Sequence, residues 1–166
     1  QDYQQALACG KKALPLCEGT DVEADCLSLM SLICFRLSNY QQAAEYAKRC
    51  YRIDERTGDP DIMSSSLNTL AGIYIGANQP KEAENYILRG IELSKKANNP
   101  GRMAVLLGMA SEVYHALGND AEALRYIDEA CQVEKSLKRE DRLMVRLAQK
   151  ASVLIGMHQY QEAERI

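Results

Sequence analysis

The chain repeats itself every 40 residues, and this repeat constrains the fold more than any other feature of the sequence. One recurring block has an alanine and, three positions later, a tyrosine; its copies are Ala43, Ala83, Ala123 and Ala163, with Tyr46, Tyr86 and Tyr126. The other half of each period has a leucine column, at Leu27, Leu67, Leu107 and Leu147, and a column of small residues at Ser31, Ala71, Ser111 and Ala151. A further copy of the first block opens the chain at residues 2–6, offset by 37. The sequence therefore predicts an array of copies of one structural unit.

Both halves of the period have the spacing of an amphipathic helix. Apolar residues recur at i, i+3, i+4 and i+7 in one half, at Leu67, Leu70, Ala71 and Tyr74, and with similar spacing in the other, at Ala83, Tyr86, Ile87, Gly90 and Leu93. We expect the alanines to leave room for a neighbouring helix backbone and the tyrosines of the 46/86/126 column to fill the gaps between repeats. Each period is thus predicted to be a pair of helices.

Capping residues mark where these helices begin. Asn39 and Asn119 are favourable N-caps, whereas Gln79 and Gln159 at the equivalent positions are weaker ones. A Gln or Glu three residues later is expected to reach back to the unpaired N–H groups, at Gln42, Glu82, Glu122 and Glu162. Pro60, Pro80 and Pro100 suit a first helical position, where the missing N–H is no loss. In the turns just before these caps, Asn78, Gly118 and His158 are residue types enriched at positive φ, and Ser38 takes the same place.

Composition and charge exclude several classes of protein. The 166 residues are 46% hydrophobic and 26% charged, which is too apolar for a disordered chain. The formal net charge of −3 argues against direct nucleic-acid binding through this segment. No run of 18 apolar residues is present, so we expect no membrane span. The chain begins at Gln1 without a signal-peptide pattern, and we expect it to be part of a longer protein.

The six cysteines, at Cys9, Cys17, Cys26, Cys34, Cys50 and Cys131, lack the spacing of a zinc site or a C-x-x-C motif. Several fall at apolar helix positions, where a free cysteine packs as a small hydrophobic residue. We interpret them as structural thiols, which favours a reducing, cytoplasmic location without excluding the periplasm.

The recurring columns resemble the tetratricopeptide repeat (TPR) family. Its pattern of a large residue, then L-G-x-x-Y, then A-x-x-x-F is matched by Leu67, Leu70, Ala71, Tyr74, Ala83 and Ile87. The sequence departs from the family in using leucine for the first large aromatic residue and in a period of 40 rather than 34. The longer period is similar to that of kinesin light chains, polarity adaptors and bacterial regulators with peptide-sensing repeats.

This resemblance implies an all-α fold, a helix-turn-helix TPR solenoid of about nine antiparallel helices wound into a right-handed superhelix. The chain would form one array over residues 1–166. It would contain the second helix of a first repeat at 1–17, repeats at about 20–58, 60–98 and 100–138, and a partial repeat at 140–166.

The family binds its partners in a concave groove lined by the first helix of each repeat. The family's groove positions fall on Asp25, Ser28, Leu32, Phe35 and Arg36; on Ser65, Asn68, Thr69, Gly72 and Ile75; on Val105, Gly108, Met109, Glu112 and His115; and on Val145, Ala148, Ser152 and Ile155. We select eight of these as the candidate peptide-binding residues: Phe35, Arg36, Asn68, Thr69, Ile75, Met109, Glu112 and His115.

Asn68 is the strongest single candidate, because in long-repeat relatives an asparagine at this point commonly hydrogen-bonds the backbone of a bound peptide. An amide offers a donor and an acceptor together, as a peptide group requires. A solvated surface asparagine is the alternative. The carboxylate clamp of chaperone-binding relatives is absent, since its positions are Ser28, Leu32, Asn68 and Gly72.

Catalytic and metal-binding motifs are missing. Glu112 and His115 lie one helical turn apart and supply only half of a metal site. No G-x-G-x-x-G, Walker loop or G-x-S-x-G occurs. We therefore expect neither an enzyme nor a cofactor.

Two functions follow from these observations. The leading hypothesis is a non-catalytic scaffold that binds a protein segment or peptide in its concave groove. The alternative is the sensor or regulatory region of a larger bacterial signalling protein or transcription regulator, with its effector domain outside this segment. In either case the terminal helices offer a route to self-association.

Overall fold

The structure, a computed structural model, describes residues 2–20 and 22–166; Gln1, the first residue of the predicted first helix, lies outside them. Nine α-helices account for the secondary structure of the described residues, which confirms the predicted all-α solenoid. They are α1 (Asp2–Cys17), α2 (Glu23–Arg36), α3 (Tyr40–Thr57), α4 (Pro60–Gly76), α5 (Pro80–Lys96), α6 (Pro100–Ala116), α7 (Asp120–Ser136), α8 (Glu140–Gly156) and α9 (Tyr160–Ala163).

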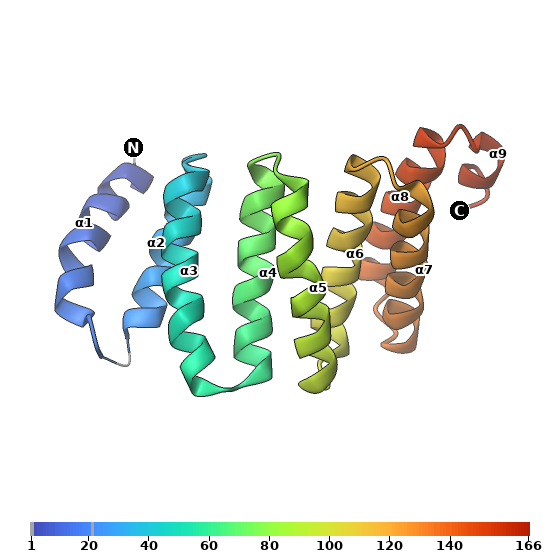
Figure 1. The fold of residues 1–166 in the computed structure, drawn as a ribbon. Coiled ribbons are helices and arrows are strands. Elements are labelled where there is room, and N and C mark those ends of the chain that lie inside the picture. The colour runs from blue at the N-terminus through green and yellow to red at the C-terminus, as the bar shows by residue number, and fades with distance from the viewer. Residues whose placement is uncertain (1, 21) are drawn as a thin grey trace.

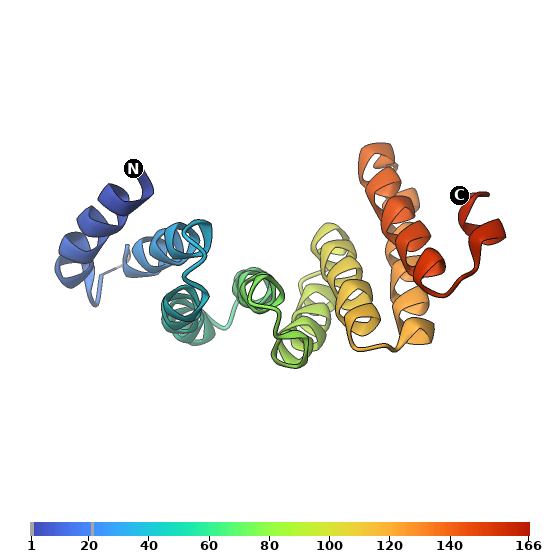
Figure 2. The same cartoon turned by 90° about the horizontal axis from the view of Figure 1, so that it is seen from above.

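The helices stand side by side in a single row, with the two termini at opposite ends (Figure 1). Each helix packs mainly on its neighbours in sequence, as an antiparallel partner. In addition, α4 packs on α6 and α6 packs on α8. Figure 2 shows α2, α4 and α6 on one side of the row and α3 and α5 on the other. The first helices of the repeats therefore form an inner layer.

The turns between helices share one backbone conformation. The φ angle is positive at Ser38, Asn78, Gly118 and His158, as predicted, and also at Gly58, Asn98 and Lys138. These seven positions lie 20 residues apart, so the backbone repeats at half the period of the sequence. Only two of them are glycine, which means that the array tolerates the cost of a left-handed side chain at the other five.

The predicted caps are present, but the reciprocal bonds are not. The side chains of Asn39 and Asn119 accept hydrogen bonds from the N–H groups of Gln42 and Glu122, while Gln79 and Gln159 make no such bond. The expectation that the Gln or Glu reaches back to a backbone N–H is wrong for the described residues. The Gln42 side chain accepts instead from the side-chain amide of Asn39 at 3.2 Å. The Glu122 carboxylate is bound by Arg125, at 2.7 and 2.9 Å.

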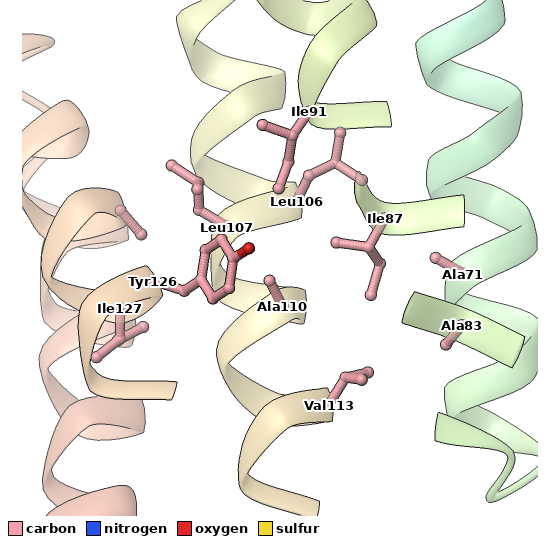
Figure 3. Packing of buried hydrophobic residues seen from close by; sticks show 11 residues of the cluster. Ala71, Ala83, Ile87, Ile91, Leu106, Leu107, Ala110, Val113, Tyr126 and Ile127 are labelled. Atoms are coloured by element: carbon pink, nitrogen blue, oxygen red, sulfur yellow. The ribbon is translucent and has the colours of Figure 1, made fainter. Parts of the chain in front are cut away.

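The core lies between the helices and repeats along the row. The alanines of the predicted column, Ala43, Ala83 and Ala123, are completely buried. Around α6 the core is continuous from α4 to α7, as Figure 3 shows for Ile87 and Ile91 on one side and Tyr126 and Ile127 on the other. Because each repeat buries its apolar face against its neighbours, stability arises from the array rather than from any single pair.

Two tyrosines of the 46/86/126 column make a contact that the prediction did not include. Tyr86 stacks on Tyr74 and Tyr126 stacks on Tyr114, with ring centroids 5.4 and 5.2 Å apart, and both pairs lie within one repeat. Consecutive repeats are instead linked by the Tyr114 hydroxyl, which donates to Glu84 at 2.6 Å. This hydrogen bond and burial raise the pKa of Tyr114.

One pair of equivalent positions can be compared at three seams, by which we mean the contacts between the second helix of one repeat and the first helix of the next. At the α3–α4 seam, Ser66 donates a short hydrogen bond to Asp54. At the α5–α6 seam the equivalent residues are Ser94 and Leu106, both completely buried. At the α7–α8 seam they are Glu134 and Arg146, which are 1% and 6% exposed. The same two positions thus hold a hydrogen-bonded aspartate and serine, a buried serine and leucine, and a buried pair of opposite charges.

Candidate functional site

The inner layer contains a hollow where α2, α4 and α6 meet, which we call the groove pocket. Its volume is about 370 Å³, and it combines apolar side chains with a few polar ones: Ser28, Ser31, Leu32, Phe35, Asn68, Thr69, Gly72, Ile73, Val105 and Met109. Four of the eight candidate residues, Phe35, Asn68, Thr69 and Met109, are therefore brought together here. Three different repeats contribute them, so the pocket exists only in the assembled array.

Helical spacing explains why these residues meet. Ser28, Leu32 and Phe35 follow one another on a single face of α2, and Asn68 and Gly72 do so on α4. Gly72 keeps the floor open, since a Cβ at this position would meet only the end of the Met109 side chain, at 3.9 Å. Leu32 is half exposed although it is apolar. The pocket is thus an open apolar surface that the chain itself leaves uncovered.

Asn68 is one of the polar residues that line the groove pocket. Its side-chain oxygen Oδ1 is buried and accepts no hydrogen bond from any described residue. The neighbouring Thr69 hydroxyl, by contrast, donates to the Ser65 carbonyl at 3.2 Å. A buried amide oxygen without a donor is costly, so a ligand that supplies an N–H group would be favoured at this point.

Two further candidates lie in a second hollow, between α6 and α8, which we call the polar pocket. Its volume is about 240 Å³, and its lining is mostly polar: Ser111, Glu112, His115, Gln149, Ser152 and Val153. His115 Nδ1 lies 2.6 Å from Asp120 Oδ1 at the start of α7. The imidazole ring rests against Gly156, where an added Cβ would come within 2.6 Å of His115 Cε1. This contact holds the ring between α6 and α8.

The last two candidates line neither pocket. Arg36 is exposed at the end of α2, and Ile75 packs on the core around α6. Gly108, one of the wider set of groove positions, also lines neither pocket. It is buried because the guanidinium of Arg146 lies against it, and a Cβ there would come within 2.3 Å of Arg146 Nη1.

Sequence reasoning missed Gln149 and assigned Ser111 only to packing. Ser111 belongs to a column of small residues that looks entirely structural, and its hydroxyl is distinguished only by what surrounds it. Gln149 follows Val145 by one turn on the inner side of α8, and this spacing was the available signal.

The polar pocket has the partners of a histidine base but no arrangement for nucleophilic catalysis. Asp120 orients His115 as a carboxylate orients a catalytic histidine. However, neither Ser111 nor Ser152 makes a hydrogen bond to the ring within the described residues, and His115 Nε2 faces Gly156. Nor do three or more His, Cys, Asp or Glu side chains come together as metal ligands in residues 2–20 and 22–166. The arrangement is suited to binding.

Membrane insertion has no candidate element in the described part of the chain, where every helix is too short or too polar to span a bilayer.

Comparison with known proteins finds sequence models and solved structures that are similar to this chain. Two sequence models described as tetratricopeptide repeat match residues 1–56 and 64–101, together more than half of the chain. No curated protein sequence matches the chain. Among solved structures, BtubC (BKLC) from P. vanneervenii has a TM-score of 0.86 and 19% identity, over 99% of this chain and 70% of BtubC.

Two other solved structures show the same fold. A putative kinesin light chain from P. anserina with nearly identical TPR-like repeats has a TM-score of 0.84 and 15% identity, over 98% of this chain and 82% of its own. A Rap protein complexed with Competence and Sporulation Factor has a TM-score of 0.79 and 13% identity, over 99% of this chain but 46% of its own. At these identities the similarity concerns the fold.

Proposed function

Because the chain belongs to the tetratricopeptide repeat family, we propose that its inner layer binds an extended segment of a partner protein or a free peptide. The observation that carries this proposal is the unpaired Oδ1 of Asn68, a residue that lines a largely apolar pocket. Apolar side chains of the ligand would contact Leu32, Phe35 and Met109, while a backbone N–H would donate to Asn68. The structural neighbour solved with Competence and Sporulation Factor supports such a use of this fold.

The chemistry of the two pockets favours a protein ligand over a nucleic acid. Neither pocket has a lysine or arginine in its lining. Phosphate groups are bound mainly by such side chains, so a nucleic acid would gain little here. Since no serine of the polar pocket hydrogen-bonds to His115 within the described residues, we propose binding without catalysis.

A selection with random peptides tests this proposal. The chain would be used to select binders from a library of random dodecapeptides displayed on phage, and the affinity of a selected peptide would be measured by fluorescence polarisation. We expect Asn68→Ala to weaken binding about 5- to 15-fold, the cost of a buried hydrogen bond.

Asn85 provides the matched control. It is an exposed asparagine on the outer helix α5, so Asn85→Ala should leave the affinity unchanged. Equal affinities of the parent and Asn68→Ala would contradict the groove assignment, as would an equal loss in both variants.

A further inference from the structure

The two pockets occupy equivalent places in the array but differ in chemistry. Two repeat periods separate Leu32 from Glu112, Phe35 from His115, and Gly72 from Ser152. The position that is apolar where α2 meets α4 is therefore polar where α6 meets α8. Because the backbone is the same in both places, the change concerns what the inner surface contacts rather than how it folds.

Comparison of the buried serines of the two pockets shows that the polar pocket contains a hydroxyl without a hydrogen-bond partner among the described residues. Ser31 and Ser111 are equivalent residues, and they are 0% and 1% exposed. The Ser31 hydroxyl donates to the Ala43 carbonyl at 2.9 Å, so its hydrogen-bonding capacity is met within its own repeat. The Ser111 hydroxyl is buried without a partner among the described residues, and Ser111 is one of the residues that line the polar pocket. A ligand in this pocket would provide the missing partner.

The charges around the polar pocket are mainly negative. Glu112 is exposed and makes no ion pair with any described residue. Asp120 adds a second carboxylate behind His115, at 2.6 Å from its ring nitrogen. The cation Arg146 is 6% exposed; its guanidinium rests on Gly108 and interacts with the charge of Glu134. Arg146 also donates to Gln149 Oε1 at 2.7 Å, which fixes the Gln149 side chain at the pocket wall.

We infer that the polar pocket is a subsite for a basic side chain, a guanidinium or an ammonium group, of the segment bound in the inner layer. The Glu112 carboxylate would pair with the cation. The hydroxyl oxygen of Ser111 would accept a hydrogen bond from one N–H group of that cation. The inference rests on the proposed function and extends it: the ligand places an apolar side chain in the groove pocket and a basic one farther towards α8.

The peptide selection gives the first test of this subsite. On the parent protein, we expect enriched dodecapeptides to carry Arg or Lys at a fixed distance from an apolar residue. The same selection on Glu112→Lys should lose this basic residue. Peptides enriched without a basic residue would overturn the subsite and leave the proposed function intact. Absence of any enriched peptide would overturn both.

A double-mutant cycle gives the second test. Replacing the basic residue of a selected peptide with glutamine should weaken binding to the parent about 3- to 10-fold, and binding to Glu112→Gln by less than about 2-fold. Glu92→Gln is the matched control, since Glu92 is an exposed carboxylate on the outer helix α5, and it should respond like the parent. An equal loss in the parent and in Glu112→Gln would overturn the subsite. Thermal melts of the variants establish that they are folded.

Discussion

The helix pairs α2–α3 and α6–α7 meet their neighbours with the same backbone and with different side chains. Phe35 and Tyr40 pack on Gly76 at one junction, with their ring centroids 5.7 Å apart. At the equivalent junction His115 packs on Gly156 and forms a hydrogen-bonded pair with Asp120, which replaces the aromatic contact. The comparison teaches that this fold fixes where side chains stand and leaves their chemistry free to differ.

The seams differ in the same direction. The α3–α4 seam contains the hydrogen bond between Ser66 and Asp54, whereas the α7–α8 seam contains Glu134 and Arg146. Both carboxylate oxygens of Glu134 are buried without a hydrogen bond from a described residue. Burial lowers the pKa of Arg146, and the charge of Glu134 opposes this shift. The α7–α8 seam is therefore the more polar of the two, and its buried charges depend on each other for compensation.

The largest expected effect breaks this charge pair. Arg146→Ala would leave Glu134 buried without its counter-charge, and we expect a loss of about 3–5 kcal/mol in the free energy of unfolding, measured by urea denaturation. The double variant Glu134→Ser plus Arg146→Leu installs the residues of the α5–α6 seam, Ser94 and Leu106. It should recover most of that loss. A double variant as unstable as Arg146→Ala would show that the charge pair is not what makes this seam sensitive.

The next effect compares the interior of the array with its end. Ala123 is completely buried, whereas its equivalent Ala163 is only half-buried in α9. Ala123→Leu should cost about 1–3 kcal/mol through overpacking, and Ala163→Leu should change stability by less than about 0.5 kcal/mol. Thermal and urea melts of the two variants measure the difference. A melt of Ala123→Leu that matches the parent would contradict the assigned register.

A third prediction concerns the pH response of Cys50, a buried residue of α3. Burial and the nearby Asp54 carboxylate raise the pKa of Cys50 from about 9 to about 11. Because the folded protein keeps this thiol protonated, its contribution to stability is fully present below about pH 9 and is lost as the pH rises to about 11. The loss should be about 2 kcal/mol.

Urea denaturation between pH 8 and pH 11 checks this response. Cys50→Ala, which copies the equivalent Ala130, should show a smaller decrease over this range than the parent. Cys9→Ala, at an exposed cysteine, should behave like the parent. If Cys50→Ala kept the full decrease in stability, the Cys50 thiol would not be its source.

The smallest expected effect concerns the turns between helices, whose positive-φ conformation is the same in both halves of the array. Lys138 has a φ of 53°, in the region that glycine adopts at the equivalent Gly58 and Gly118. Lys138→Gly should stabilise the protein by about 0.5–1 kcal/mol, because the left-handed conformation costs a side chain more than it costs glycine. Asn98→Gly, at the equivalent turn before α6, should shift the thermal midpoint in the same direction. A decrease in both midpoints would show that these turns are not strained.

The fold could be predicted almost completely from the sequence, because its information is local and repeated. The alanine and leucine columns, the Asn caps and the Pro positions each indicate the same helix pair several times over. The tyrosine contacts were harder to predict, since periodicity places Tyr86 and Tyr126 on the packed face of their helices without showing that each stacks on a tyrosine of its own repeat. Contacts of this kind depend on how two helices cross.

The candidate site could be predicted only in part. Phe35, Asn68, Thr69 and Met109 meet because they occupy one face of three consecutive inner helices, which spacing can predict. The burial of Gly108 could not be foreseen, because it depends on the direction of a long side chain, that of Arg146, from the next repeat. Likewise, Ser31 and Ser111 occupy equivalent positions in their repeats. Only the structure shows that the Ser31 hydroxyl is hydrogen-bonded and that the Ser111 hydroxyl has no partner among the described residues.

The central claim, that the inner layer is the binding surface, is tested most directly by nuclear magnetic resonance. The backbone amide signals of the 15N-labelled chain would be recorded with and without a selected dodecapeptide. The account predicts the largest shifts at inner positions such as Thr69, Gly72 and Met109, with little change at Lys81 and Glu92 on the outer helix α5. The largest shifts on the outer helices, with the inner positions unchanged, would contradict it.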